Sequence, residues 1–382
     1  MSLSDALIRG QRWPLPGIPS GEGVLVEGGS GVDVARVIVQ DNDRAGIDIQ
    51  SGSSATIRDV FLVGQRSRDP LDAGSGVGLS ANGGASLEAH RLTARGNARR
   101  GVHVAASTAT ITDVHLSKNA QGEPDQLGLY LGGGGQLIAR RVQAEGEGVM
   151  VAEQASRLVL SEASLIGAPE GPGFLFALQG STLKATKVVI TGRANPNLLL
   201  SGGNAEITDA VVAGDDGGIL VEAFGQARLE RMLIDGARFG LRVRGASVEG
   251  HDVVLRSTTI HGIAVESDSR ATLARVKLDS TKGLGVRVKD LSQIDIQDLI
   301  EIGTATAGRG VHVDTGGRFN GSHLLIEGNE AYGLEGSPQA DGFDLTDGEI
   351  SRNPTALFGL VPADLSCCLV RVRYRDNGTI LR

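Results

Sequence analysis

Aromatic residues and cysteines are scarce in this sequence. Phenylalanine, tryptophan and tyrosine make up 3% of the 382 residues, which leaves few rings on which bases or sugars could stack. The two cysteines, Cys367 and Cys368, are neighbours and belong to no CxxC pattern or Cys/His cluster, so we predict no metal site and no cofactor. A disulfide between them is one alternative. We expect two buried thiols instead, because adjacent side chains of a strand point to opposite faces.

Long apolar runs and an excess of basic charge are also missing. No run of apolar residues is long enough to cross a membrane as a helix. The net charge of -8, with no Lys/Arg tract, excludes nucleic-acid binding, which needs a basic surface. The opening "MSLSDALIRG" lacks the apolar core of a secretory signal, so no export signal is visible in this chain.

Glycine, in contrast, is abundant, with 56 residues, and it recurs in a pattern. Short units of the form glycine, apolar, variable, apolar begin at Gly23, Gly46, Gly76, Gly101, Gly128, Gly148, Gly173, Gly218, Gly240, Gly262, Gly285 and Gly310. Asn197 replaces the glycine in one clear copy, and asparagine also tolerates a left-handed backbone, so we expect positive φ at this corner. The period-two alternation predicts a strand with one buried face.

Each glycine unit is followed by a second stretch, such as "ATIRDVFLVG" from Ala55, that predicts two more short strands joined by a sharp bend. Three short strands in roughly 24 residues cannot bury their apolar faces alone, so successive coils must stack on one core. We predict an all-β, right-handed parallel β-helix of about fifteen coils over 23–382, weaker from about Gly333, with 1–22 as an N-terminal extension and cap. A sandwich or propeller is disfavoured, because it would place Asn-Gly or Asp-Gly hairpins between the strands.

One position, just before the third strand, alternates in charge from coil to coil. It contains Arg36, Asp59, Arg91, Asp113, Arg141, Glu162, Lys187, Asp209, Arg231, Asp252, Arg275, Asp298, His323, Asp347 and Arg371. Equivalent residues of stacked coils lie about 4.8 Å apart, so like charges would repel and opposite charges can pair on both sides. We call this series the charge ladder and predict a structural role for it, because a slip by one coil would place like charges together.

Outward positions of the first strand hold three candidate sites. Asp48, His103 and Tyr130 lie beside the insertions 66–75 and 119–126, which could wall a polar pocket with His103 as acid or base. The competing interpretation is scattered surface residues, since Asp48 and His103 are two coils apart, or roughly 10 Å.

The second candidate is an apolar strip on a face that should be exposed to solvent. It consists of Met150, Leu175, Leu199 and Leu220. Exposed apolar patches usually mark contacts, so this strip predicts a self-association or partner surface, or a floor covered by the loop 167–173.

The third candidate is a charged group of Arg242, Glu266, Arg287, Lys289 and His312. It could clamp an acidic sugar, with Lys289 or Arg287 as base and the other cations on the substrate carboxylate. In the neighbouring column, however, Arg244, Glu266, Lys289 and Asp314 alternate in sign. A second structural ladder is therefore the favoured interpretation.

The coil pattern from Gly23 onward resembles the right-handed parallel β-helix superfamily, the pectate-lyase-like proteins. The resemblance implies a short helix over the N-terminal end of the core, for which "SLSDALIRG" before Trp13 is the candidate. It also favours an extracellular or cell-surface location. The chain lacks the "WIDH" and "RxPxxR" signatures of pectate lyases and the "DPHD" motif of alginate epimerases, and its acidic residues are not gathered for calcium.

Two functions remain open from the sequence. The favoured one is a non-catalytic scaffold, adhesion or binding module whose partner is a polysaccharide or a protein. The other is a lyase or hydrolase that acts on an acidic glycan. An enzyme should hold unpaired ionisable groups that converge in a groove, whereas a scaffold should pair those side chains with one another.

Overall fold

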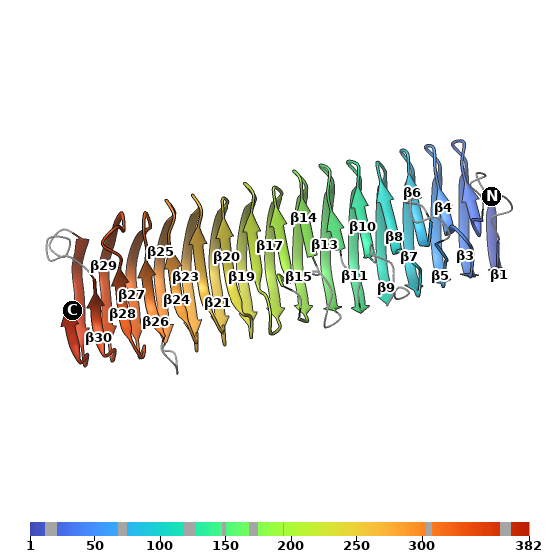
Figure 1. Ribbon diagram of the computed structural model, residues 1–382. Coiled ribbons are helices and arrows are strands. Elements are labelled where there is room, and N and C mark those ends of the chain that lie inside the picture. Colours follow the sequence, from blue (N-terminus) through green and yellow to red (C-terminus); the bar gives the residue numbers. More distant parts are fainter. Residues whose placement is uncertain are drawn as a thin grey trace. The chain divides into compact units, whose positions relative to one another are not determined.

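The fold is described from a computed structural model. It covers residues 1–11, 21–67, 75–117, 127–146, 150–167, 175–193, 195–302, 308–359 and 368–381. The chain divides into two compact units, Met1–Thr191 and Gly192–Arg382. Each is a stack of coils in which a short strand alternates with a long one (Figure 1).

Unit 1 contains eight long and seven short strands. The long strands are β1 (Ser2–Arg9), β3 (Gly31–Gln40), β5 (Ser54–Val63), β7 (Ser86–Arg95), β9 (Thr108–Ser117), β11 (Gln136–Gly146), β13 (Arg157–Gly167) and β15 (Thr182–Thr191). The short strands are β2 (Val24–Val26), β4 (Ala45–Ile49), β6 (Val77–Asn82), β8 (Arg100–Ala105), β10 (Leu127–Gly132), β12 (Met150–Ala152) and β14 (Leu175–Leu178). Each strand pairs in parallel with the equivalent strand of the neighbouring coil, as β3 does with β5.

Unit 2 repeats the arrangement with eight long and nine short strands. The long strands are β17 (Asn204–Ala213), β19 (Gln226–Asp235), β21 (Ser247–Arg256), β23 (Arg270–Asp279), β25 (Gln293–Ile302), β27 (Arg318–Glu327), β29 (Gly342–Ser351) and β31 (Leu369–Arg375). The short strands are β16 (Leu198–Ser201), β18 (Ile219–Glu222), β20 (Phe239–Arg244), β22 (His261–Glu266), β24 (Leu284–Val288), β26 (Arg309–Val313), β28 (Tyr332–Gly336), β30 (Thr355–Phe358) and β32 (Thr379–Leu381).

Every long strand bends once, at its charge-ladder residue. All fifteen ladder residues have a left-handed backbone, with φ between 49° and 57°. One such residue turns the chain onto a new face, so each long strand supplies two faces and the short strand a third. The fold is a parallel β-solenoid of about 14 turns with three parallel sheets, and the predicted all-β architecture is confirmed.

The core consists of the inward residues of all three faces. Long strands alternate buried and accessible positions, and the short strands place residues such as Ile47 and Leu79 at 0% exposure. Because Ile47 pairs in register with Leu79, each inward side chain packs against its counterpart in the next coil. This stacking lets short coils share one continuous core.

Most of the described corner glycines have a different role from the one predicted. Neither Gly46 nor Gly262 has positive φ, nor does Asn197. A Cβ atom on Gly46 would lie 2.6 Å from the carbonyl oxygen of Gly78, and one on Gly262 would lie 2.6 Å from that of Gly285. These glycines are needed because successive backbones approach closely there, so the expected left-handed corner is wrong at these positions. It is found at Gly76, which has φ of 71°.

Amide side chains form hydrogen-bonded stacks inside the coils, a feature that the sequence analysis missed. In unit 1, Asn42 Nδ2 donates to Gln65 Oε1 at 2.9 Å. In unit 2, the Asn329 backbone N–H donates to Asn353 Oδ1 at 2.9 Å, and Asn329 Nδ2 donates to Glu301 Oε2 at 2.9 Å. Glu301 is fully buried. Burial raises its pKa to about 7, against the hydrogen bond from Asn329.

Two expectations for the terminal regions need correction. The segment Ser2–Arg9 is strand β1, which pairs with β3, and not the helix that the resemblance implied. Its alternating pattern explains the difference, because Leu3, Ala6 and Ile8 continue the inward positions of the coils. Cys368 is disulfide-bonded, so the expected free thiol is wrong there, while Cys367 and Trp13 lie outside the described residues.

Candidate functional site

Many acids and bases of the charge ladder form separate ion pairs. Arg275 donates from Nε to Asp252 Oδ1 at 2.6 Å and from a terminal nitrogen to Oδ2 at 2.7 Å. The same two-point contact joins Asp59 to Arg91, Asp113 to Arg141 and Asp209 to Arg231. In each pair the base lies one coil after the acid. In these pairs the expected pairing on both sides is replaced by one close ladder partner per residue, and the ladder residue of the coil beyond attracts more weakly.

The ladder also has a member that the sequence analysis missed. Asp5 in β1 has φ of 53° and accepts two hydrogen bonds from Arg36, both at 2.6 Å. The hydrogen bond from Arg36 lowers the pKa of Asp5, so the carboxylate stays charged. The ladder of unit 1 thus starts with an acid, and Arg36 is the basic half of its first pair.

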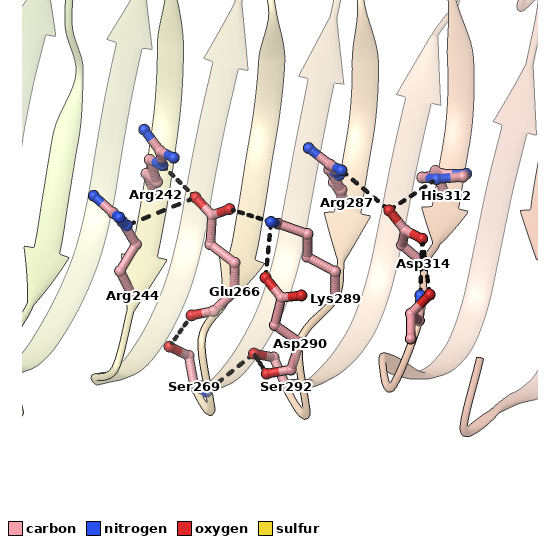
Figure 2. Close-up of polar contacts among 11 residues, drawn as sticks. Arg242, Arg244, Glu266, Ser269, Arg287, Lys289, Asp290, Ser292, His312 and Asp314 are labelled. Carbon is pink, nitrogen blue, oxygen red and sulfur yellow. Dashed lines mark hydrogen bonds and ion pairs between the residues drawn. The ribbon is translucent and has the colours of Figure 1, made fainter. Parts of the chain in front are cut away.

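The charged candidate group lies on the outward face of the short strands in unit 2. Figure 2 shows the Glu266 carboxylate between Arg242 and Arg244 on one side and Lys289 on the other. Arg242 Nε donates to Glu266 Oε1, and Lys289 Nζ lies 3.4 Å from Oε2. Arg244 Nε lies 4.0 Å from Oε1. In this part of the predicted second ladder, the buried Glu266 is shared by cations of the coils before and after it. Lys289 pairs next with Asp290 of its own coil, whereas Asp314 pairs with Arg287.

Neighbouring coils continue this pairing. Arg287 donates to Asp314 Oδ2 at 3.1 Å, and His312 Nε2 lies 3.9 Å from the same oxygen (Figure 2). His312 Nδ1 lies 2.8 Å from Glu335 Oε2, without the alignment of a hydrogen bond. Arg309 donates to that same carboxylate oxygen at 2.6 Å. The candidates Arg242, Glu266, Arg287, Lys289 and His312 therefore lie on neighbouring coils. Arg242 and Lys289 contact Glu266, whereas Arg287 and His312 contact acids outside the candidate group.

The pairing fixes the charge states in this group. Burial opposes ionisation of Glu266, but the hydrogen bond and charge of Arg242 and the charge of Lys289 outweigh it and lower its pKa. The pKa of Lys289 is raised, first by the hydrogen bond to Asp290 and also by Glu266. Lys289 is therefore held as an ammonium ion, which makes it a poor general base near neutral pH.

The polar candidate group in unit 1 contains a residue that the sequence analysis did not name. Ser80 in β6 pairs in register with Asp48 in β4 and with His103 in β8, so three successive coils carry Asp, Ser and His in one column. All three are buried, at 2%, 1% and 6% exposure. Asp48 Oδ1 and His103 Nδ1 form no hydrogen bond. The expected distribution of scattered surface residues is wrong for this column.

Burial sets the charge of this column. It raises the pKa of Asp48, against hydrogen bonds from Gln50 and Ser80. Burial, reinforced by the charges of Arg100 and Arg99, lowers the pKa of His103 to about 3. The imidazole is therefore neutral at physiological pH.

Tyr130 lies one coil beyond His103, and their ring centroids are 5.0 Å apart. The Tyr130 hydroxyl donates to Glu153, and the Arg100 guanidinium lies 3.9 Å from the Tyr130 ring centroid. The tilted ring contact, the guanidinium and the hydrogen bond thus hold Tyr130 against the protein. The insertions that were expected to wall a pocket here lie largely outside the described residues.

The predicted apolar strip is wrong at Leu175, which is 1% exposed and belongs to the core. Met150 pairs in backbone register with Leu129 and Leu175, and its side chain lies outside the described residues. Leu199 and Leu220 do face outward, half-buried and in register with each other.

A groove that was not predicted crosses the first half of the long strands in unit 2. It has a volume of about 500 Å³ and is lined by Gly250, His251, Thr272, Leu273, Ala274, Asp295, Ile296, Gln297, Asn320, Gly321, Ser322, Asp344 and Thr346. Gly250 and Gly321 occupy inward positions where the neighbouring strands carry leucine or isoleucine. Asn320 Nδ2 donates to Asp295 Oδ1 at 2.5 Å, so part of the lining is already hydrogen-bonded.

The described part of the chain contains neither a cluster of metal ligands nor a membrane-spanning helix. No group of three or more His, Cys, Asp or Glu side chains is placed to hold a metal ion. No helix within it is long and apolar enough to cross a membrane.

Comparison with known proteins reveals likeness in fold. No protein-family model and no curated protein sequence matches this chain. The periplasmic alginate epimerase AlgG is 9% identical, with a TM-score of 0.32 over 92% of this chain and 77% of its own. The Agl-KA catalytic domain is 10% identical, with a TM-score of 0.38 over 92% of this chain and 62% of its own.

A third structure, the A-module of the Azotobacter vinelandii mannuronan C-5 epimerase AlgE6, is 14% identical, with a TM-score of 0.25 over 93% of this chain and 91% of its own. The likeness of this chain to these proteins is distant and is one of fold. Identities this low assign no activity, since one fold hosts many functions.

Proposed function

We propose that this chain is a non-catalytic β-solenoid scaffold or binding module. The observation that carries the proposal is the pairing in the charged group of unit 2, where Glu266 is shared by Arg242, Arg244 and Lys289. Catalysis on an acidic glycan would need cations free to bind the substrate carboxylate and a base able to take a proton. Here the cations are matched to acids of the protein itself, and the ammonium form of Lys289 is stabilised.

The groove in unit 2 is the surface best suited to the binding part of this proposal. Its lining combines the apolar side chains of Leu273, Ala274 and Ile296 with His251, hydroxyls, amides and the carboxylates of Asp295 and Asp344. The polar groups would hydrogen-bond a neutral, hydroxyl-rich ligand, and the apolar ones would pack against it. Each carboxylate already has a cation of the protein beside it, because Arg270 lies 3.3 Å from Asp295 and Arg318 lies 3.3 Å from Asp344. With its charges matched in this way, the lining suits a neutral ligand better than an acidic one.

The proposal is tested with a panel of acidic and neutral polysaccharides. Turnover is followed by the absorbance of unsaturated products and by reducing ends, and binding by calorimetry. We expect no turnover, and any binding of a neutral glycan should weaken in Asn320→Ala but not in Lys289→Ala. Turnover that is abolished by Lys289→Ala or His312→Ala would overturn the proposal and establish the enzyme.

A further inference from the structure

The edge strand β1 of unit 1 has an incompletely covered inward face. Among the described residues β1 pairs only with β3, and its inward residues Leu3, Ala6 and Ile8 are half-buried. The β3 residues opposite them, Val34, Val37 and Val39, are at most 1% exposed. An edge strand with accessible apolar residues is a template for pairing with another strand.

The edge strand β31 of unit 2 has the same property. Its inward residues Leu369, Val372 and Tyr374 are half-buried. Opposite them in β29, Leu345 and Ile350 are 2% and 1% exposed. In the adjoining short strand β32, Leu381 follows the inward register of Leu357 and is 38% exposed.

The ladder charges at these two edges are opposite. The ladder residue of β1 is Asp5, held by Arg36, and that of β31 is Arg371, which donates to Asp347 Oδ2 at 2.5 Å. In the internal coils, the base that completes one ion pair is followed, one coil later, by the acid of the next pair. Placing β1 next to β31 would therefore repeat the internal alternation of the ladder.

We propose that a second copy of this chain stacks on the first, with β31 of one copy paired in parallel with β1 of the next and Arg371 beside Asp5. Alignment at these ladder residues places Leu369 on Leu3, Val372 on Ala6 and Tyr374 on Ile8. Each inward apolar residue thus gains an apolar neighbour. The adjoining short strands would place Leu381 on Val24.

The same alignment also brings two like charges together, Arg375 and Arg9. Each already has an acid within its own copy, because Arg375 Nε lies 3.3 Å from Asp376 and Arg9 Nε lies 3.4 Å from Asp41. The repulsion is therefore partly neutralised. Pairing of two β31 strands would instead gather Arg371, Arg373 and Arg375 of both copies, so the charges favour contact between unlike edges.

A contact between unlike edges does not close on itself. Each added copy presents a new β31 edge, so the assembly grows by further copies and depends on protein concentration. Because the ladder charges are exposed, their attraction should weaken as salt concentration rises. The inward apolar contacts should persist.

Sedimentation velocity of the full chain over a concentration series tests this proposal. We expect species of two or more copies whose share grows with concentration. Val372→Asp places a charge between the stacked cores and should abolish them. The matched variant Val370→Asp, at an outward position of the same strand, should retain them.

A second variant tests the charge term without breaking an internal pair. Asp347→Arg with Arg371→Asp inverts the last ion pair but keeps it, and it presents an aspartate to Asp5 of the next copy. We expect assembly to be reduced at low salt and the melting temperature to be unchanged.

Wild-type protein that sediments as a single copy at every concentration would overturn the stacking, as would assembly that survives Val372→Asp. Retained assembly together with polysaccharide turnover would leave the stacking intact and overturn only the proposed function.

Discussion

Arg275 donates two hydrogen bonds to Asp252 across successive coils of unit 2, although both residues have φ above 50° and are solvent-exposed. A left-handed backbone costs free energy for residues other than glycine, so these positions carry charged side chains in spite of their conformation. The ion pair accounts for this choice. It sets which coil lies above which, because each acid fits the base of the following coil.

The first prediction concerns this pair. Asp252→Arg puts a third arginine between Arg231 and Arg275 on successive coils, so repulsion should lower the melting temperature, more at low salt than at high salt. Adding Arg275→Asp restores the pair and should recover part of the loss. Asp216→Arg, at an exposed position away from the ladder, is the control. Equal melting temperatures for all the variants would contradict a structural role for the ladder.

The alternation of charge made the ladder predictable from the sequence. Its sign changes at every coil, and parallel stacking is the arrangement that makes such a change favourable. The sharp bend was predicted, but its left-handed backbone was not, because arginine alternates with aspartate at this position and arginine gives no signal for positive φ. Asp5 was missed because it precedes the first glycine unit.

The errors in assigning outward positions on the short strands have a common physical source. In "GVMV" and "GFLF" three successive residues are apolar, so the pattern does not show which of them faces inward, and a slip of one residue exchanges the two faces. Leu175 was misplaced in this way. In "GVGL" either Gly76 or Gly78 could be the glycine that starts the unit. Because Gly76 was chosen instead of Gly78, Ser80 was not assigned to the same outward position as Asp48 and His103.

The second prediction tests the close approach at the glycine column. Gly262→Ala would place a Cβ atom 2.6 Å from the Gly285 carbonyl oxygen, so the coils must separate there. We expect a loss of about 1 to 3 kcal/mol of unfolding free energy, measured by denaturant titration. Gly348→Ala is the control, since its Cβ would come no nearer than 3.4 Å to any atom. Equal losses would contradict steric exclusion at the column.

The third prediction concerns His103. Its pKa of about 3 means that the folded protein keeps the ring neutral, while the unfolded chain binds a proton below about 6.5. Because the unfolded chain takes up this proton and the folded protein does not, the free energy of unfolding should decrease as the pH falls below about 6.5. We expect its ring resonances to stay constant from pH 8 to pH 5 in the folded protein and to titrate in urea. A folded-state titration near pH 6.5 would contradict its burial.

The fourth prediction concerns Glu301, whose effect has the opposite sign. Its pKa is about 7 in the folded protein and about 4.5 in the unfolded chain, so the folded state binds the extra proton between these values. Stability should therefore fall as the pH rises from 4.5 to 7, by roughly 3 kcal/mol, and then level off. Glu301→Gln keeps the shape and an acceptor for Asn329 but does not titrate.

Urea unfolding of both proteins at pH 4.5 and pH 8 measures this effect. The two should be nearly equal in stability at pH 4.5, where the carboxyl is protonated when folded. At pH 8 the Gln variant should be the more stable. Wild-type Glu301 must then either carry a charge inside the core or stay protonated at a pH above its pKa, and both cost free energy. A constant difference between the proteins at both pH values would show that Glu301 acts through packing or its hydrogen bond to Asn329, and not through its charge.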